Sequence, residues 1–510
     1  MPAVGPIHAF ELPAHEDLGA RCIRSGAVTG GAQLVRLALV LTGTIALARQ
    51  LAPADFGLVA MASALLGLLA VARELGLSLA TVQRDRIRAE QVSALFWVNL
   101  AFGLALAAVT AALAPLVAWF YGDARLNGVV FALAAAFAVG GAAVQHRALL
   151  QRGMRFGALA AVDLVALAVS TALAIAAASL GAGYWALVVL PVAQTTTASA
   201  LLWRACPWRP GPPTRGADVR SLLTFGGHVT GTGLLHQLSR NLDTVLIGWF
   251  WGAAPLGLYT KAYQLALMPI RNIQAPLASV AIPVLSRLQR DPERFRHFYL
   301  KSLRLVAFAG LPGLAAVAVL SREIVALVLG ERWLAASPLL AVLACAAAVQ
   351  LIAGTLGWIF VALGHTRRML RWSGLASGAT ILSFAIGLPW GPLGVAVAYT
   401  VCVYALRYPH LAAALRDSPV SIADVLRAIH RPVLLALTAA LAMAPTRTAL
   451  QTHAPTTILL CTLCAGAGAW LVSVLLLRRA REDFAEVRDV VWRLVAARSN
   501  AAARPPVPAS

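Results

Sequence analysis

Long apolar stretches separated by short polar connections run through almost the whole chain. A helix that crosses a bilayer needs about 20 apolar residues, because about 30 Å of hydrocarbon is crossed at about 1.5 Å per residue. Fourteen stretches satisfy this requirement, so the pattern predicts an all-α polytopic membrane protein. The expected spans lie near residues 27–51, 56–80, 91–119, 127–146, 157–180, 183–203, 221–252, 255–286, 302–320, 336–363, 372–389, 392–415, 431–445 and 456–477.

The first six spans resemble the next six at an offset near 200 residues. The segment ADFGL at 54–58 corresponds to APLGL at 254–258, and QRD at 83–85 recurs at 289–291. Because six is an even number, both repeats have the same orientation, which predicts two pseudo-symmetric six-helix lobes with a substrate path between them. The predicted organisation is a cytoplasmic tail (1–26), an N-lobe (27–204), a cytoplasmic linker (205–220), a C-lobe (221–415), two extra helices (416–477) and a basic cytoplasmic tail (478–510).

Composition and charge narrow the class of protein. Hydrophobic residues make up 60% of the chain and charged residues 12%, against about 45–50% and about 25% in soluble proteins. The net charge of +21 is of a kind found in nucleic-acid-binding proteins. However, 31 of the 42 Lys and Arg residues lie on one side of the expected spans, five on the other and six within them. This follows the positive-inside rule with both termini in the cytoplasm, so no nucleic-acid partner is expected, and the loop arginines are expected to be solvated or to face lipid headgroups.

Polar and ionisable side chains inside spans are costly and usually face a cavity. In the first span, Gln33 shares a helical face with Arg36, and the eighth span carries Lys261, Gln264 and Arg271 on roughly one face. Cations exceed acids within the spans by six to three, which favours an anionic ligand. The candidate cavity residues are Arg36, Arg73, Arg240, Asp243, Lys261, Gln264 and Arg271, with Gln33, Glu74, Asn99, His236 and Arg407 as secondary candidates.

Arg36 and Arg271 are the strongest candidates for ligand binding. Each lies near the middle of its span without an acid three or four residues away. An anionic ligand or a partner on another helix is therefore required.

Structural roles compete with ligand binding for the other charged residues. Arg240 and Asp243 form a possible internal ion pair, and Arg73 and Glu74 a possible adjacent pair. Arg407 has the alternative of extending outward to the membrane surface. Asp163, near the start of the fifth span, has the alternative of stabilisation by the helix dipole. The residues alone do not decide between these roles.

Signatures of catalysis do not rise above chance in the sequence. Neither a metal-ligand cluster, nor a nucleophile–base pair, nor a nucleotide-binding glycine loop stands out. The outward connections are short, the longest being about 15 residues around 322–336, whereas a membrane enzyme would be expected to need a substantial outward loop or a soluble catalytic domain. A non-enzymatic protein without a cofactor is expected.

Four segments carry a family resemblance. ARQLAPADFGL at 48–58, RELGLS at 73–78, SRNLD at 239–243 and GLPWGP at 387–392 resemble polysaccharide flippases of the multidrug/oligosaccharidyl-lipid/polysaccharide exporter superfamily. The similarity extends, in order, over roughly residues 25–430.

This resemblance implies a fourteen-helix, two-lobed transporter of the bacterial inner membrane. Its substrate would be an oligosaccharide repeat unit linked to undecaprenyl pyrophosphate, and its partners the membrane lipids, with the polysaccharide polymerase or export machinery as a further candidate. By similarity to the lipid II flippase, a distant relative with cavity cations in the corresponding spans, Arg36, Arg73 and Arg271 would line the cavity. The alternatives are a drug/cation antiporter of the same superfamily and a membrane-embedded polysaccharide polymerase or ligase.

Overall fold

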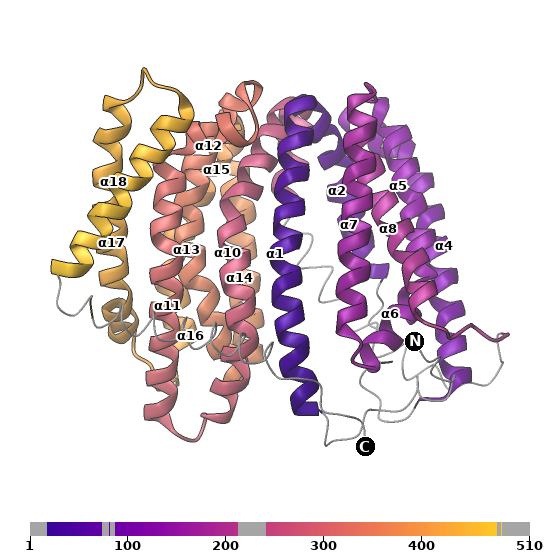
Figure 1. Cartoon of the computed structure of the whole chain (residues 1–510), viewed down its shortest axis with the longest axis horizontal. Helices are drawn as coiled ribbons and strands as arrows, with labels where there is room; N and C mark the ends of the chain where they lie inside the picture. Colours follow the sequence, from indigo (N-terminus) through magenta and orange to yellow (C-terminus); the bar gives the residue numbers. More distant parts are fainter. Residues whose placement is uncertain (1–17, 74–80, 82–86, 213–240, 477–480, 482–510) are drawn as a thin grey trace. The chain divides into compact units, whose positions relative to one another are not determined.

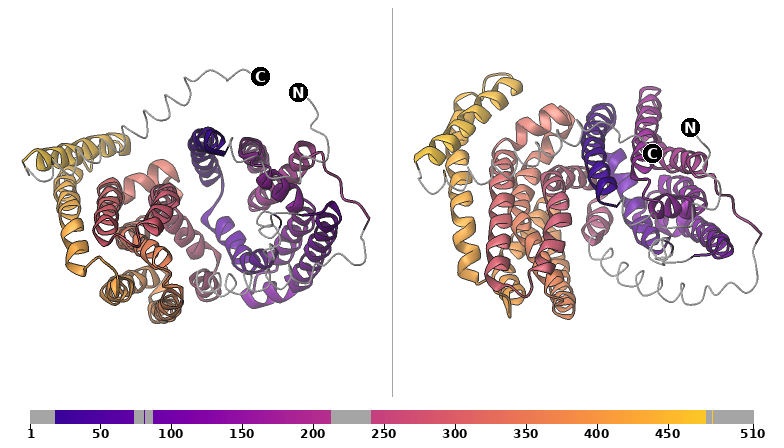
Figure 2. Two further views of the ribbon diagram at one scale, coloured as in Figure 1. Left: turned by 90° about the horizontal axis from the view of Figure 1, so that it is seen from below. Right: turned by 60° about the horizontal axis from the view of Figure 1, so that its bottom comes forward.

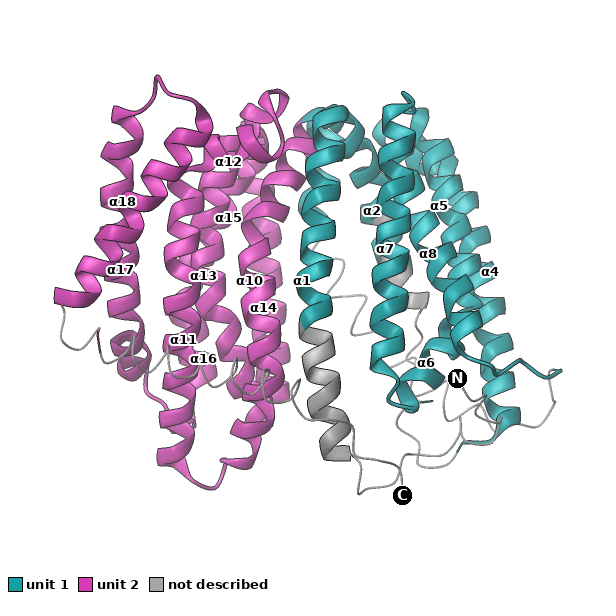
Figure 3. Ribbon diagram, viewed as in Figure 1, with its two compact units in different colours: residues 1–254, 496–510 teal, residues 255–495 magenta. Residues whose placement is uncertain are grey.

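The computed structural model describes residues 18–73, 81, 87–212, 241–476 and 481. Its residues form two compact units, one comprising Met1–Ala254 with Ala496–Ser510 and the other Pro255–Val495 (Figure 3). The described part is built from α-helices and short 3-10 turns without a strand. Figure 2 shows the bundled helices of each unit from two further directions. The lobe, linker and tail boundaries expected above stay predictions.

The first unit contains seven helices labelled in Figure 1 and one more after the linker. The helix that follows the linker is described over 241–251. The seven are α1 (Leu18–Gln50), α2 (Pro53–Arg73), α4 (Ala89–Tyr121), α5 (Arg125–Gly141), α6 (Val144–Arg152), α7 (Phe156–Ser179) and α8 (Trp185–Ala205).

The second unit consists of the remaining helices, of which α10 begins two residues before the boundary between the units. They are α10 (Ala253–Arg287), α11 (Pro292–Val319), α12 (Ser321–Val328), η3 (Glu331–Ala336), α13 (Ser337–Ala362), α14 (Thr366–Gly387), η4 (Leu388–Trp390), α15 (Gly391–Ala405), α16 (Arg407–Leu415), α17 (Ile422–Ala449) and α18 (Pro455–Leu476).

Ten helices in the described ranges are long and apolar enough to cross a membrane, or eleven with a bent pair as one span. The expected spans at 56–80 and 221–252 extend beyond the described residues. The stretch Thr366–Leu415 contains two expected spans, which are separated by the turn η4. The number fourteen therefore stays a prediction.

Glycines let α4 and α5 approach each other closely in the first unit. A Cβ atom added to Gly103 would lie 2.8 Å from the backbone oxygen of Phe137. One added to Gly141 would lie 2.8 Å from the backbone oxygen of Asn99. Because backbone atoms obstruct both positions, neither helix can take a side chain there without moving apart from its neighbour.

Gly103→Ala is expected to lower the free energy of unfolding by about 1–2 kcal/mol through overpacking. The sign of this change in the free energy of unfolding is informative, because replacing glycine with alanine normally stabilises a helix interior by up to about 1 kcal/mol. Gly378→Ala in the interior of α14 is the matched control, since no atom lies within 4 Å of its added Cβ. Denaturation of the purified protein in detergent should show a lower free energy of unfolding for Gly103→Ala and a higher one for the control. Equal changes in both variants would contradict the close α4–α5 contact.

The expected span at 127–146 is not one straight helix. It is divided into α5 and α6, which are bent by 43° at the break between them. The bend brings Arg152 into the interior, where it is 2% exposed and donates to the backbone oxygen of Thr81 at 3.0 Å. The expectation that Arg152 is solvated is therefore wrong, because its guanidinium group satisfies a backbone carbonyl inside the unit.

The first part of the expected linker packs against the first unit. Trp97 Nε1 on α4 donates to the backbone oxygen of Gly211 at 2.8 Å, and the Gly211 amide donates to Ser93 Oγ at 3.1 Å. Trp208 is buried in an aromatic cluster with Phe96. Residues 206–212 thus form part of this unit, and the rest of the linker, 213–220, lies outside the described residues.

The two extra helices pack on the bundle of the second unit, where α17 contacts both α11 and α18. Asp424, in the first turn of α17, forms an ion pair with Arg296 on α11 at 2.5 Å. At the other end, Arg447 Nε lies 2.9 Å from Glu323 Oε1 on α12. Ser421 and Asp424 also cap the helix reciprocally through their side chains and backbone amides. Both ends of α17 are therefore fixed to this unit.

Candidate functional site

The sequence-predicted cation of α1 is exposed and unpaired in the described structure. Arg36 lies 14 residues before the end of α1 and 18 after its start, more than about 20 Å from either end at about 1.5 Å per residue. Its side chain is exposed, as is that of Gln33 on the preceding turn. Among the described residues, Arg36 has neither an acidic partner nor a side-chain hydrogen bond. Its guanidinium group is accessible at a depth where hydrocarbon would surround a spanning helix.

The second unit presents an equivalent cation on α10. Arg271 lies in the middle of this 35-residue helix, is exposed, and forms no ion pair with another residue of the described ranges. Between two and three turns earlier, Lys261 Nζ donates to Gln264 Oε1 at 3.2 Å. Gln264 is exposed and Lys261 is half-buried. This helix therefore carries a polar stripe that ends on a guanidinium group.

The neighbouring α13 holds this helix in place. Gln274 Nε2 on α10 donates to the backbone oxygen of Leu351 on α13 at 2.7 Å. The amide of Gln274 occupies the space beside Gly354, where an added Cβ would lie 2.2 Å from it. Arg271 therefore lies one helical turn before Gln274, the residue that fixes α10 to α13.

Asp243 differs from the exposed cations. It is 4% exposed, and its Oδ1 accepts a hydrogen bond from the Thr244 amide at 2.7 Å. Its predicted partner Arg240 and the nearby His236 lie outside the described residues. The ion pair expected between Arg240 and Asp243 stays a prediction.

Two further candidates also lie where the structure gives no account of the side chain. Arg73 is the last residue of α2, but the description does not extend to its side chain, and Glu74 lies wholly outside the described residues. Their expected places in the cavity stay predictions.

Asn99 and Arg407 are both withdrawn from solvent. Asn99 on α4 is 2% exposed, and its side-chain amide has no hydrogen-bond partner within the described ranges. Arg407, at the start of α16, contacts His410 Nδ1 through Nη2 at 3.3 Å, while its Nε and Nη1 atoms are buried. The alternative in which Arg407 extends outward is not observed, because these atoms are enclosed by the protein.

The first unit contains a polar cavity that the sequence did not predict. Arg147 on α6 and Asp163 on α7 form an ion pair in its wall, with 2.5 Å between Nη2 and Oδ1. Gln194 and Thr195 on α8 also line it. Arg147 was expected to be a solvated loop residue; its side chain is 36% exposed, but it lies on the short helix α6 and pairs with Asp163. The available signal was the polar run QTTT at 194–197 inside an otherwise apolar helix.

Chemically, the exposed cations and the cavity offer two kinds of recognition. Arg36 and Arg271 present guanidinium forks, which suit phosphate oxygens. The cavity of the first unit offers a charge-neutral set of donors and acceptors. Neither set has the nucleophile, base and orienting group that a covalent reaction would need.

Comparison with known proteins decides the family. The sequence profile described as "polysaccharide biosynthesis protein" matches residues 46–338, more than half of the chain. The chain belongs to this family. The predicted resemblance to a family of polysaccharide biosynthesis is confirmed.

Two relatives in the family illustrate how far the similarity extends. The teichuronic acid biosynthesis protein TuaB of Bacillus subtilis (strain 168) is 27% identical over 311 residues, which are 61% of this chain and 64% of TuaB. The match thus spans slightly less than two thirds of that relative. The succinoglycan biosynthesis transport protein ExoT of Rhizobium meliloti (strain 1021) is 23% identical over 447 residues, 87% of this chain and 90% of ExoT.

A solved structure shares the fold of this family member. The lipid II flippase MurJ, in an inward closed conformation, matches 89% of this chain and 98% of its own with a TM-score of 0.71. At 15% sequence identity, this similarity establishes the fold. The predicted all-α polytopic membrane architecture is confirmed, whereas the symmetry of two six-helix lobes stays a prediction.

Proposed function

We propose that this protein is a flippase for undecaprenyl-pyrophosphate-linked oligosaccharide repeat units. It would move them from the cytoplasmic to the periplasmic leaflet of the bacterial inner membrane for polysaccharide or lipopolysaccharide biosynthesis. Family membership supports a role in polysaccharide biosynthesis, and the names of its relatives include a succinoglycan transport protein and a lipid II flippase. Both termini would lie in the cytoplasm, as the distribution of arginines predicts.

One observation carries the proposal most directly: Arg36 and Arg271 are exposed, mid-helix guanidinium groups without an acidic partner among the described residues. A pyrophosphate cannot enter hydrocarbon without compensation of its charge. Arginine supplies a permanent charge and paired N–H donors that match phosphate oxygens. We assign both residues to pyrophosphate binding.

The remaining candidates extend this assignment. Lys261 and Gln264 would bind polar groups of the same substrate from α10, and Arg73, Arg240 and Asp243 would complete the set. The polyprenyl tail would stay in lipid, because its transfer into water would expose a large apolar surface. Alternating access would then use the two compact units as its moving bodies.

A drug/cation antiporter of the same superfamily is the main alternative function. Such a transporter would require an accessible acid for its cationic substrate. In the described spans, Asp163 is paired with Arg147 and Asp243 is buried. The exposed unpaired groups of these spans that we identify are cations, which favours an anionic substrate. Uptake of organic cations by vesicles containing the purified protein would instead support the antiporter.

A membrane-embedded polysaccharide polymerase or ligase is the second alternative. Its active site would need reacting groups held in mutual reach. The candidate groups described above are cations, amides and hydroxyls suited to binding, so transport without a covalent step is favoured.

Deletion of the gene tests the proposed function. We expect the lipid-linked oligosaccharide to accumulate in the inner membrane, accessible from the cytoplasmic side, while polymer export stops. The measurement is the lipid-linked sugar fraction from inside-out vesicles, treated with a membrane-impermeant glycosidase or sugar oxidant. Accumulation of the lipid-linked unit on the periplasmic side would instead place the defect after translocation and would contradict a flippase.

A further inference from the structure

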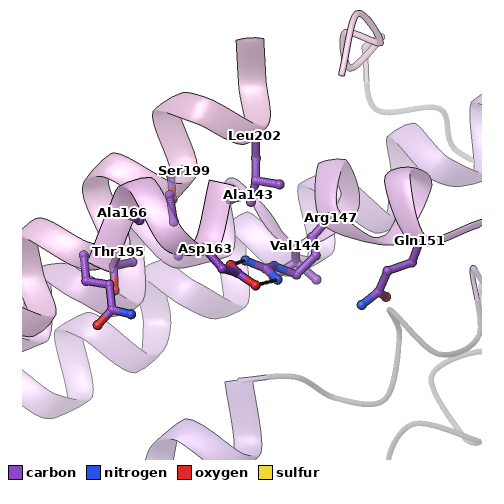
Figure 4. A pocket seen from close by; sticks show the side chains of 12 residues that line it. Ala143, Val144, Arg147, Gln151, Asp163, Ala166, Thr195, Ser199 and Leu202 are labelled. Carbon is purple, nitrogen blue, oxygen red and sulfur yellow. Dashed lines mark hydrogen bonds and ion pairs between the residues drawn. The ribbon is translucent and has the colours of Figure 1, made fainter. Parts of the chain in front are cut away.

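The polar cavity of the first unit has no assigned role. Its volume is about 410 Å³, and its walls come from α5, α6, α7 and α8. Figure 4 shows the Arg147 and Asp163 side chains turned toward each other in this wall. The volume lies within the range of about 300–1,000 Å³ that is usual for ligand pockets. The cavity lies entirely within one unit, so its geometry does not depend on the other.

The charged groups of the cavity neutralise each other. Arg147 donates to both carboxylate oxygens of Asp163, with Nη2–Oδ1 at 2.5 Å and Nη1–Oδ2 at 3.3 Å. Their side chains are 36% and 43% exposed, so the pair remains accessible. Arginine has five N–H donors, and these bonds use two of its nitrogens. The pair can therefore contribute further hydrogen bonds to a ligand without adding net charge.

Three polar side chains of the wall are uncommitted, whereas a fourth, Ser199, donates its hydroxyl to the Val139 backbone oxygen at 3.3 Å. The side chains of Gln151, Gln194 and Thr195 line the cavity and form no hydrogen bond with another described residue. An amide and a hydroxyl can each donate and accept. By contrast, the next residue along the chain, Thr196, lies outside the lining and donates to the Val192 backbone oxygen at 2.8 Å. Gln194 and Thr195 therefore present free polar groups to the cavity, unlike Thr196.

These polar groups extend into the membrane-spanning part of the unit. Asp163 lies seven residues after the start of α7, and Gln194 lies 11 residues before the end of α8. At about 1.5 Å per residue, they are about 10 Å and about 16 Å from those helix ends. Polar groups at such depth are costly unless water or a ligand satisfies them. A structural role alone leaves the free amides and the hydroxyl unexplained.

The chemistry of the wall selects a neutral, hydroxyl-rich ligand. A phosphate would require an excess of positive charge, and an organic cation would require an unpaired acid. Sugar hydroxyl groups donate and accept in the same way as the amides and hydroxyl of the wall. We propose that this cavity is a sugar subsite that binds part of the oligosaccharide, separate from the cations assigned to the pyrophosphate. The inference rests on the proposed flippase function and adds the place where the glycan is recognised.

Two variants remove the free polar groups while keeping side-chain size nearly constant: Gln194→Leu and Thr195→Val. Neither side chain has a hydrogen-bond partner in the described part of the chain, so folding should be retained. Thr196→Val is the matched control, because it changes the same atoms one position away, outside the cavity.

The test compares two ligands on the purified full-length protein in detergent. One is sugar-free undecaprenyl pyrophosphate, and the other is the glycosylated form purified from bacteria that lack this chain. We expect wild type and Thr196→Val to bind the glycosylated form more tightly. Gln194→Leu and Thr195→Val should each lose about threefold to tenfold of this preference, the effect of about one hydrogen bond, with unchanged affinity for the sugar-free ligand.

Three outcomes would overturn the subsite. Equal wild-type affinity for both ligands would show that the sugar is not recognised. Retention of the full preference by both cavity variants would place sugar recognition elsewhere, and an equal loss in Thr196→Val would show that the effect is not specific to the cavity. If wild type binds neither ligand, the proposed function fails together with the subsite, which distinguishes that failure from the other three.

Discussion

Arg36→Ala and Arg271→Ala should each abolish polymer export while the protein still inserts into the membrane. Both side chains are exposed in mid-helix without an acidic partner among the described residues, so their removal leaves no buried charge behind. The pyrophosphate, however, would lose a permanent charge and a paired donor set at the depth where solvation is poorest. A charge-assisted contact contributes about 1.5–3 kcal/mol, or roughly 10- to 150-fold in binding.

The measurement is exported polysaccharide per unit of membrane-inserted protein in a deletion strain that expresses each variant. Arg287→Ala is the matched control on α10, since this exposed arginine lies in the last turn of the same helix. Lysine at position 36 or 271 retains the charge without the planar fork, so partial export is expected. Normal polymer output from both alanine variants would refute the assignment of these residues to the substrate.

Arg447→Ala is expected to lower the free energy of unfolding by about 3 kcal/mol, because it leaves Glu323 as an unpaired buried carboxylate. The Glu323 side chain is 7% exposed, and its Oε2 atom has no hydrogen-bond partner within the described part of the chain. The ion pair at 2.9 Å therefore supplies the principal compensation for this charge. Thermal unfolding in detergent, followed by tryptophan fluorescence, measures the loss.

The double variant Glu323→Leu/Arg447→Leu distinguishes a buried charge from general damage. Replacing both partners with apolar groups removes the cost of the unpaired charge, so most of the stability should return. Arg332→Ala is the control, as an exposed arginine in the neighbouring turn η3. A double variant as unstable as Arg447→Ala, or a control with the same loss, would contradict this reading of the ion pair.

Hydrophobic periodicity located most helices closely. The stretches expected at 157–180, 336–363 and 456–477 correspond to α7 (Phe156–Ser179), α13 (Ser337–Ala362) and α18 (Pro455–Leu476). An apolar run of about 20 residues is nearly sufficient to define a spanning helix, because few other structures satisfy the backbone in lipid. The short span expected at 431–445 is longer in the structure, since α17 (Ile422–Ala449) includes a capped polar first turn.

The hydrophobic pattern predicted neither the bend between α5 and α6 nor the ion pairs between helices. Two residues after the break at Gly141, the chain continues as the polar helix α6, so the hydropathy pattern marks the end of a span there and does not show that a helix follows. As a result, Arg147 and Arg152 were assigned to a loop, although both lie on α6 and Arg152 is buried. The pairing of Arg147 with Asp163 also depends on how α6 packs on α7, which neither periodicity nor spacing encodes.

The sequence indicates only part of the candidate site. Arg36 and Arg271 are conspicuous in it because each is an ionisable residue in an apolar run, and their role in binding stays a prediction. Gln194 and Thr195 were missed, since neutral polar residues are common in spans and become informative only when a cavity brings them together with an ion pair. A charged residue is visible in the sequence itself, whereas a cavity is defined only by how the helices pack together.

Reconstitution into liposomes tests the central proposal most directly. Purified protein would be incorporated together with the undecaprenyl-pyrophosphate-linked oligosaccharide, and a membrane-impermeant glycosidase added outside would measure how much substrate becomes accessible with time. A flippase predicts that the inner-leaflet pool becomes accessible with wild type and stays protected with Arg36→Ala, Arg271→Ala or empty liposomes. Equal protection of the inner pool with wild-type protein and with empty liposomes, across imposed proton, sodium and voltage gradients, would contradict the proposal.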